Sequence, residues 1–292
     1  MICHVCRTPN PESVTYNNLP LFRCSSCGLL WRQDFDVPLA YYDEADAGST
    51  PARRSARMRN CKDRIALMRR YMPIVHVCDL GTGEGTFLEA LKEAGGSGVG
   101  IEPGKKYVAE AQTHGVRIVG ATEADAAGVV QQEGIQSFTL FHVIEHVPNP
   151  RQTLQTLFDA LPLGGCILLE TPTMDSPILR AKQYQDALIY PEHLFYFNDT
   201  NLPRLLDEVG FRVVAHGRRD FDQYHLPIRE SLRRLFLRFP KQLPTKQAGA
   251  GHEPVAAAEM HSSWVRSVVR TLLARLVIVS GRLNYQWVIA QK

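Results

Sequence analysis

The chain has 292 residues, 45% of them hydrophobic, and its 33 Lys and Arg against 30 Asp and Glu give a formal net charge of +3. This length and composition allow a sizeable core and indicate one large domain with attachments, or two domains. The sequence has no apolar run of the roughly eighteen residues that a membrane-spanning helix needs, and Met1–Cys6 lacks the basic and apolar regions of a secretory leader. We therefore expect a cytoplasmic protein.

The seven cysteines are an odd number, which argues against a complete set of disulfides. Cys78 and Cys166 lie in apolar, strand-like runs, which is typical of small buried side chains. Four others form two C-x-x-C pairs separated by seventeen residues: Cys3, Cys6, Cys24 and Cys27. Four thiolates at this spacing predict a structural zinc ribbon without an open catalytic position, and Gly28 suits the tight turn after the second pair. His4 is a second-best ligand, and a reduced redox pair would not require two pairs.

The next segments lead from this module to the main domain. Leu29–Asp46 carries Trp31, Phe35 and the pair Tyr41–Tyr42 among acidic residues, a pattern that indicates a segment wrapped onto a larger core. Arg53–Met72 is predicted to be a basic amphipathic helix. Its apolar positions recur at three- and four-residue spacing: Met58, Cys61, Ile65 and Met68.

A strand, a glycine turn and a helix are predicted over Val75–Leu91. Apolar residues with strand character come first, three glycines interrupt them, and apolar residues at helical spacing follow. The three groups are Val75, Val77 and Leu80; Gly81, Gly83 and Gly85; and Phe87, Leu88 and Leu91. Glycines let the backbone approach a ligand without a Cβ in between, and the free N–H groups of the next helix face the same place. Taken alone the pattern is weak evidence, since turns collect glycine for many reasons.

Glu102 strengthens the prediction of a ligand site. It ends the apolar segment Val99–Ile101, where a doubly wound sheet places an acid that accepts both ribose hydroxyls. Asp79 precedes the glycines, and the third glycine of the dinucleotide pattern G-x-G-x-x-G is absent from the turn. A cofactor with a ribose and without a pyrophosphate fits these features better than a dinucleotide does.

Further helices and strands alternate along the chain. Helices are predicted over Lys105–His114, Gln152–Leu161 and Asn201–Val209. Strands are predicted over Val116–Val119, Phe138–Val143, Cys166–Glu170, Phe211–Ala215 and Asn284–Ala290. Alternation of this kind indicates an α/β fold.

Four ordered motifs resemble those of the class I S-adenosylmethionine-dependent methyltransferases: Asp79–Gly85, the acid Glu102, Phe141–Pro150 and Leu163–Pro172. The resemblance covers about residues 73–221. It implies a Rossmann-like, doubly wound sheet of seven strands in the order 3-2-1-4-5-7-6. Thr139 stands where the family usually has an Asp, and we expect this departure to affect the fold only slightly.

The resemblance also divides the chain. The expected parts are a zinc-ribbon-like module (1–37), a helical linker or lid (38–72), an S-adenosylmethionine-binding domain (73–221 with 281–292) and a basic helical insertion (222–280). Up to His225 there are 22 Lys and Arg against 27 Asp and Glu, whereas from Leu226 onward there are 11 against 3. The amphipathic stretches Ile228–Phe239 and Trp264–Val279 are therefore expected either to contact an anionic membrane surface or to pack on the sheet edge or a second subunit.

The resemblance implies which residues bind the cofactor. The main chain at Gly81 and Gly83 meets its amino-acid end, Glu102 holds the ribose, and His142 lies near the reacting methyl group. Thr122 and Glu123 follow the third strand, where a side chain can reach the adenine. The full set is Asp79, Gly81, Thr82, Gly83, Gly85, Glu102, Pro103, Thr122, Glu123 and His142.

The loop Ile189–Asp199 follows the fifth strand, at the rim where sheets of this type bind ligands. Glu192 and His193 lie there among aromatic residues, and a His beside a carboxylate is suited to act as a general base. The pair resembles the Glu-His element of sugar C-methyltransferases, which also carry an N-terminal cysteine zinc motif. The candidate catalytic residues are therefore His193, Glu192 and His142, with a structural role as the alternative for the first two. Tyr41–Tyr42 either covers the acceptor site or packs in the core.

The expected activity is methyl transfer from S-adenosylmethionine to carbon or oxygen of a small molecule, a sugar or glycan intermediate of surface-polysaccharide or secondary-metabolite biosynthesis. No specific nucleic-acid partner is expected. RNA methylation is the rival activity, because some RNA methyltransferases also begin with a zinc module and basic surface can follow phosphates. However, enzymes that methylate the amino group of a base use an Asn/Asp-Pro-Pro-aromatic motif after the fourth strand. This chain has His146–Asn149 there instead. A non-catalytic binding module is the third alternative, although such a module has no need of Gly81, Gly83 and Glu102.

Overall fold

The computed structural model describes residues 1–35, 51–181, 184, 189, 192–219 and 284–292. Two predictions fall outside these residues: the position of Tyr41–Tyr42 and the basic insertion 222–280. None of the helices in the described part of the chain is long and apolar enough to cross a bilayer.

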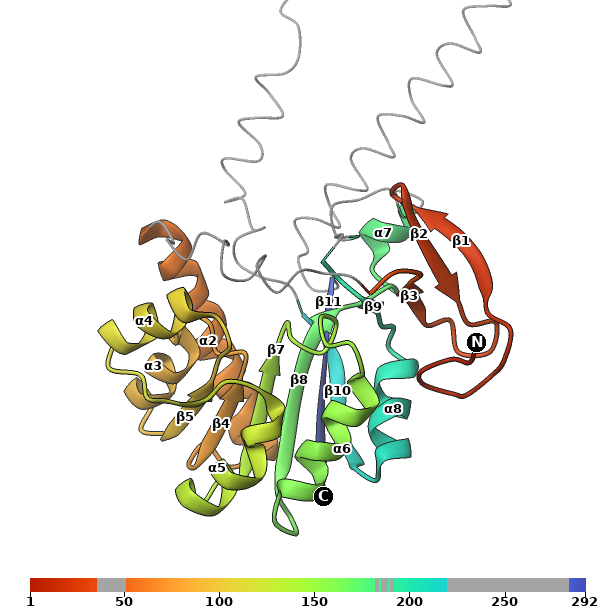
Figure 1. The fold of residues 1–292 in the computed structure, drawn as a ribbon. Coiled ribbons are helices and arrows are strands. Elements are labelled where there is room, and N and C mark those ends of the chain that lie inside the picture. The colour runs from red at the N-terminus through yellow and green to blue at the C-terminus, as the bar shows by residue number, and fades with distance from the viewer. Residues whose placement is uncertain (36–50, 182–183, 185–188, 190–191, 220–283) are drawn as a thin grey trace, which may run out of the picture. The chain divides into compact units, whose positions relative to one another are not determined.

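A seven-stranded sheet runs through the main domain in the order β10-β11-β8-β7-β4-β5-β6 (Figure 1). Its strands are β4 (Val77–Leu80), β5 (Gly98–Ile101), β6 (Ile118–Gly120), β7 (Ser137–Phe141), β8 (Cys166–Pro172), β10 (Arg212–Arg219) and β11 (Tyr285–Gln291). The strands from β4 to β8 run parallel, whereas β11 is antiparallel to both β8 and β10. With β4 counted as the first strand, this arrangement confirms the predicted order 3-2-1-4-5-7-6.

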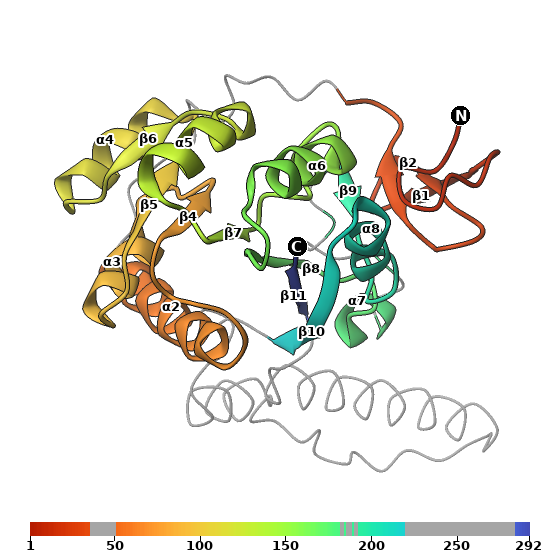
Figure 2. The ribbon, with the colours of Figure 1, turned by 90° about the horizontal axis from the view of Figure 1, so that it is seen from below.

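Helices cover both faces of this sheet (Figure 2). On one face lie α2 (Pro51–Tyr71) and α3 (Thr86–Glu93), and on the other lie α5 (Ala126–Glu133), α6 (Pro150–Ala160) and α8 (Asn201–Val209). The remaining helices are α4 (Lys105–Thr113) beside β6, the short η1 (Glu123–Asp125) and α7 (Pro177–Ala181).

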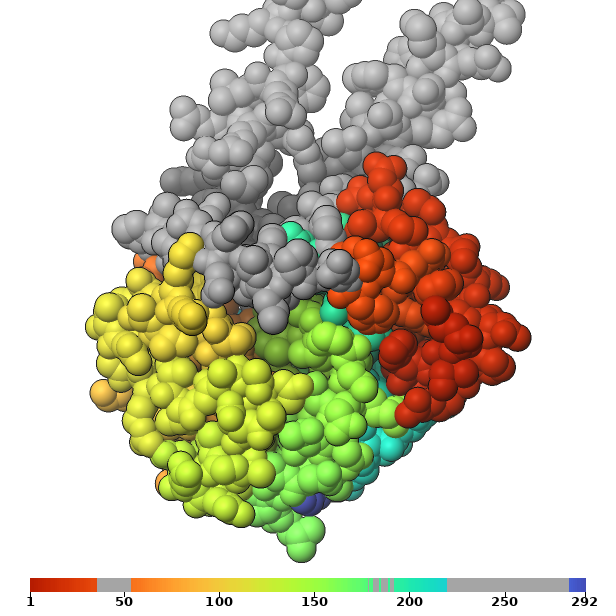
Figure 3. All heavy atoms as spheres, in the orientation of Figure 1, coloured from red at the N-terminus to blue at the C-terminus, as the bar shows by residue number. Residues whose placement is uncertain are grey.

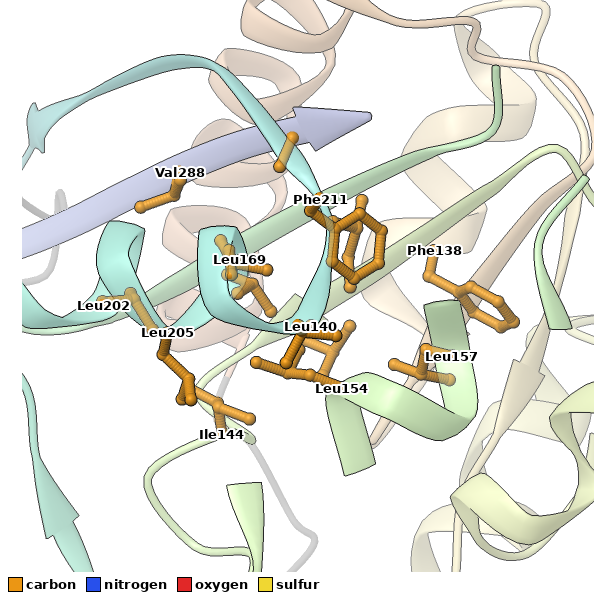
Figure 4. Packing of buried hydrophobic residues seen from close by; sticks show 14 of the residues in the cluster. Phe138, Leu140, Ile144, Leu154, Leu157, Leu169, Leu202, Leu205, Phe211 and Val288 are labelled. Carbon is orange, nitrogen blue, oxygen red and sulfur yellow. The ribbon is translucent and has the colours of Figure 1, made fainter. Parts of the chain in front are cut away.

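The side chains of β8 explain why the sheet needs two layers of helices. Ile167 and Leu169 pack in the cluster that contains the buried residues of α6 and α8, while Cys166 and Leu168 pack with those of α2 and α3. Successive side chains of a strand point to opposite faces, so a strand that is apolar at consecutive positions must be buried on both. Figure 4 shows the first cluster, which includes Leu169 of β8 and Leu205 of α8.

The N-terminal module is joined to the main domain through a shared sheet. Its strands are β1 (Glu12–Tyr16), β2 (Leu19–Arg23), β3 (Leu30–Arg32) and β9 (Phe195–Tyr196). β9 comes from the main domain and pairs with β3. Trp31 is fully buried, and Asn198 and Asn201 donate hydrogen bonds of 3.1 and 3.3 Å to the carbonyl oxygen of Cys27. The described part of Leu29–Asp46 therefore packs onto the main domain as predicted. Figure 3 shows red N-terminal atoms against cyan-green atoms of the main domain.

Arg64 anchors α2 to the sheet through a buried ion pair with Glu170 of β8. Arg64 is 8% exposed and Glu170 is 1% exposed, and the guanidinium of Arg64 lies 4.0 Å from the centre of the Phe141 ring. The Nε atom of Arg219 lies 3.4 Å from Oε2 of Glu170. Burial raises the pKa of Glu170, but Arg64, His142 and Arg219 together outweigh burial and hold this pKa well below its usual range.

Replacing Arg64 by Met should lower the free energy of unfolding by about 3 kcal/mol, because it leaves the buried Glu170 carboxylate with one guanidinium partner fewer. Urea denaturation followed by tryptophan fluorescence measures the change. The control Arg70→Met, at an exposed position of the same helix, should cost less than about 0.5 kcal/mol. Equal losses for the two variants would contradict a buried anchor.

Candidate active site

Three glycines form the turn between β4 and α3, and each is constrained differently. Gly81, Gly83 and Gly85 have positive φ angles of 70°, 55° and 77°. A Cβ on Gly81 would lie 2.5 Å from a methyl group of Val143, and one on Gly85 would lie 2.7 Å from Val116. A Cβ on Gly83 would meet no described atom within 4 Å, so Gly83 borders open space, which we call the cofactor hollow. The predicted glycine turn thus lets a ligand approach the main chain at Gly83.

Glu102 faces the cofactor hollow from the residue after β5. Its Oε2 accepts a hydrogen bond of 2.8 Å from the N–H of Gly83, and its Oε1 accepts one of 2.9 Å from the N–H of Gly104. Burial raises the pKa of Glu102, and the two N–H groups oppose this rise. Pro103 follows at the surface. The carboxylate is therefore fixed beside the glycine turn, and it keeps lone pairs for further donors because each oxygen carries two.

Asp79, in β4, is 2% exposed and accepts a hydrogen bond of 2.6 Å from the hydroxyl of Thr139 in β7. Burial raises the pKa of Asp79 to about 6. A second carboxylate at position 139 would repel Asp79, whereas the Thr hydroxyl supplies a donor. The departure from the family pattern at Thr139 is thus compatible with the fold. Thr82 is also buried, in the turn that follows β4.

Thr122 lies between β6 and η1, and Glu123 is the first residue of η1. The N–H of Thr122 donates a hydrogen bond of 3.0 Å to Asp125, and Oε1 of Glu123 accepts one of 3.1 Å from the hydroxyl of Thr153 on α6. These bonds fix the turn against α6. The contact of Thr122 and Glu123 with an adenine stays a prediction.

His142 follows β7 and connects two carboxylates. Its N–H donates a hydrogen bond of 2.8 Å to the carbonyl of Glu170, and its φ of 59° is uncommon for a residue other than glycine. Its Nδ1 lies 3.4 Å from Oε1 of Glu145, and its Nε2 lies 3.5 Å from Oε1 of Glu170. Burial lowers the pKa of His142, but the two carboxylates outweigh burial and raise it. The backbone thus holds the imidazole between two acids that favour its charged form.

Glu145, His146 and His193 form a second group, which we call the Glu145 cluster. Their carboxylate oxygen and ring nitrogen atoms lie within 4.8 Å of one another. The ring centres of the two histidines are 4.8 Å apart in an edge-to-face arrangement. The carbonyl of Glu145 accepts hydrogen bonds of 2.8 and 3.1 Å from the N–H groups of Leu194 and Phe195, so the loop before β9 is fastened to the segment after β7. The structure therefore brings His193 close to the motif that contains His142.

The cluster combines one charged carboxylate with a neutral imidazole. Burial raises the pKa of Glu145, but the neighbouring histidines outweigh burial and lower it to about 2. Burial lowers the pKa of His193 to about 4, so its imidazole is neutral at pH 7. Glu192, the predicted companion of His193, contributes its backbone carbonyl, which lies 3.0 Å from Nδ1 of His146.

Four charged residues of this region were not predicted as site residues: Arg64, Glu145, Glu170 and Arg219. The sequence contains a signal for the two acids, because the carboxyl ends of neighbouring parallel strands such as β7 and β8 meet at one edge of the sheet. It contains no comparable signal for Arg64 and Arg219, which come from α2 and β10.

The four N-terminal cysteines converge, with all their Sγ atoms within 4.8 Å of one another. The Sγ–Sγ distances are 3.6 Å between Cys3 and Cys27 and 3.4 Å between Cys6 and Cys24. Four thiolates bound to one tetrahedral zinc ion lie about 3.8 Å apart, since the Zn–S distance is about 2.3 Å. The donor set therefore fits the predicted metal.

Two similar turns hold these cysteines. Arg7 and Gly28 both have positive φ angles, and the N–H of each donates to the carbonyl of the first cysteine of its pair. His4, the second-best ligand in the sequence analysis, has its ring edge-to-face against Trp31 and Phe195. The geometry thus favours the four thiolates as the donor set.

Comparison with known proteins gives the family. Residues 48–216, more than half of the chain, match a family model described as a methyltransferase domain. The C-methyltransferase NovU of Streptomyces niveus is 26% identical over 176 residues, which are 59% of this chain and 40% of NovU. The ubiquinone biosynthesis O-methyltransferase of Pseudomonas fluorescens strain SBW25 is 28% identical over 156 residues, 52% of this chain and 58% of that enzyme. The chain thus spans about half the length of these curated relatives.

Solved structures share the fold. A chain in the complex between the Haloferax volcanii Trm112 methyltransferase activator and a methyltransferase has a TM-score of 0.51 at 14% identity, covering 81% of this chain and 92% of that chain. Together with the seven-stranded sheet and the match to the family model, this places the chain in the methyltransferase domain family, with the fold of the S-adenosylmethionine-dependent enzymes.

Proposed function

We propose that the protein transfers the methyl group of S-adenosylmethionine to carbon or oxygen of a small acceptor, a sugar or glycan intermediate. The observation that carries the proposal is the position of the Glu102 carboxylate against Gly83, at the edge of the cofactor hollow. The relatives are named as a C-methyltransferase and an O-methyltransferase, which supports transfer to either kind of atom. The sugar class rests on the likeness of the N-terminal cysteine motif and the Glu192–His193 pair to sugar C-methyltransferases.

The residues around the cofactor hollow fit S-adenosylmethionine. Gly83 leaves room for a ligand against the main chain, and Glu102 beside it would accept hydrogen bonds from two ribose hydroxyls. Gly81 brings the turn against Val143, which follows His142, so the cofactor hollow adjoins the histidine-bearing segment. When bound, the cofactor supplies a methyl group on a sulfonium, which a nucleophile attacks in line. The protein supplies orientation.

An acceptor that reacts through a carbon acid or a hydroxyl must also lose a proton. We assign this deprotonation step to His193. The imidazole of His193 is neutral at pH 7, because burial lowers its pKa. A histidine must be neutral before it can accept a proton as a general base. His142, held between Glu145 and Glu170, is suited to carry positive charge instead and to position the acceptor.

We propose further that the four N-terminal cysteines bind a structural zinc ion. The closed set of four thiolates leaves no coordination position for a substrate. The ion would fix the two turns that support Trp31 and β3, and through β3 also β9.

Gly83→Ala should weaken S-adenosylmethionine binding at least tenfold, about 1.4 kcal/mol, because the new methyl group enters the cofactor hollow. The fold should lose only about 1 kcal/mol for the positive φ. Isothermal titration calorimetry and thermal melting measure the two effects. Gly115→Ala is the matched control, since Gly115 also has a positive φ and open space within 4 Å, and it should show the stability loss alone. Equal binding by both variants would refute the assigned cofactor site.

The proposed reaction is tested with radiolabelled S-adenosylmethionine and a panel of nucleotide sugars, phenols and bulk RNA. On the accepted substrate, His193→Ala should lower kcat by about 10²- to 10⁴-fold and leave cofactor affinity within about twofold. His114→Ala, at a histidine paired with Glu110 on α4, is the control. Loss of cofactor affinity together with turnover would mean that His193 is structural, and transfer to RNA alone would refute the small-molecule acceptor.

Cys27→Ser should release about one zinc ion per chain and lower the melting temperature, because three thiolates hold the ion less firmly and β3 loses its support. Zinc is counted by plasma mass spectrometry. Cys166→Ser, which removes a buried thiol outside the group, should leave the zinc content unchanged. An unchanged zinc content in Cys27→Ser would count against the four-cysteine site.

A further inference from the structure

We infer that the Glu145 cluster binds a second metal ion, a divalent transition-metal ion held by Glu145, His146 and His193. The site is separate from the four cysteines and has different chemistry. The role of the ion in activating the acceptor rests on the proposed function. The existence of the metal site rests on the geometry of the three side chains alone.

The burial of the Glu145 carboxylate is the first argument. Glu145 is 1% exposed, and neither of its carboxylate oxygens accepts a hydrogen bond from any residue that the structure describes. The Nδ1 atom of His142 lies 3.4 Å from Oε1 of Glu145. The contact with His142 offsets part of the cost of burying this carboxylate, and a bound ion would supply the close ligands that its oxygens lack among the described residues. The donor atoms of His146 and His193 lie within 4.8 Å of the same carboxylate.

The orientation of His146 is the second argument. Its Nδ1 lies 3.0 Å from the backbone carbonyl of Glu192, an acceptor, so Nδ1 carries the proton and Nε2 carries the lone pair. A ring nitrogen that donates to a backbone carbonyl is the usual support of a metal-bound histidine. The hydrogen bonds from Leu194 and Phe195 to the carbonyl of Glu145 hold the segments that supply the three donors together.

The donor set indicates the kind of ion. Two imidazoles and one carboxylate suit Zn²⁺, Mn²⁺, Fe²⁺ or Co²⁺, whereas Mg²⁺ and Ca²⁺ prefer oxygen ligands. Three protein ligands leave positions open for an acceptor hydroxyl. His193 would then act as a ligand of the ion and not as the base itself. The ion would lower the pKa of the acceptor hydroxyl, and the hydroxyl proton would pass to solvent. The oxygen lone pair forms the new O–CH₃ bond while the S–CH₃ bond breaks, which leaves S-adenosylhomocysteine.

The test counts metal in the 292-residue chain after incubation with excess Zn²⁺ and desalting. The wild type should retain about two zinc ions per chain, one on the cysteines and one on the Glu145 cluster, and Glu145→Gln about one. His193→Gln is the second variant, in case the first does not fold, and it should also retain about one. Glu110→Gln, which disrupts a surface pair with His114, is the matched control and should retain about two.

Co²⁺ gives an independent readout, because thiolate ligands produce intense charge-transfer absorption and imidazole and carboxylate ligands do not. Co²⁺ added to wild-type protein that holds one equivalent of Zn²⁺ on the cysteines should fill the Glu145 cluster and give weak bands without thiolate absorption, and these bands should be absent from Glu145→Gln. One zinc per wild-type chain and no such bands would overturn the inference and leave His193 as a general base. Two zinc ions without methyl transfer to any acceptor would refute the proposed function and leave the metal site standing.

Discussion

The parallel register of four neighbouring strands determines where the candidate site residues lie. Leu80 of β4 pairs with Ile101 of β5 and with Leu140 of β7, and Leu140 pairs with Leu169 of β8. The residues that follow these paired positions are Gly81 after β4, Glu102 after β5, Phe141 at the end of β7 and then His142, and Glu170 in β8. Because the strands are apolar and buried on both faces, a slip of one residue would turn their core side chains the wrong way.

A set of buried charges keeps this edge of the sheet in place. Arg64 from α2 and Arg219 from β10 approach Glu170 of β8, and His142 connects Glu170 with Glu145. Each charged group has at least one neighbour of opposite sign, and the partners come from parts of the chain that are far apart in sequence. Such a set contributes little net stability compared with an apolar core, but it penalises displacement of any member.

The sequence predicts most strands and the glycine turn well, because buried parallel strands read as apolar runs and the turn needs positive φ at fixed places. The order of the strands in the sheet comes from the resemblance to the class I methyltransferases. It predicts β6 imperfectly, since Val116 packs against Gly85 before the strand begins at Ile118. The helix α5 was not predicted because Ala126 and Val129 are its only buried residues. The Glu145 cluster depends on a loop that folds back onto the segment after β7, and no local pattern encodes such a meeting.

The two-residue strand β9 belongs to two structures at once. It completes the N-terminal sheet beside β3, and it directly follows the loop that carries His193. A chain that began after residue 35 would leave the backbone groups of β9 and the ring of Phe195 facing water. A change in the cysteine module that shifts β3 would therefore also shift β9 and the segment that carries His193.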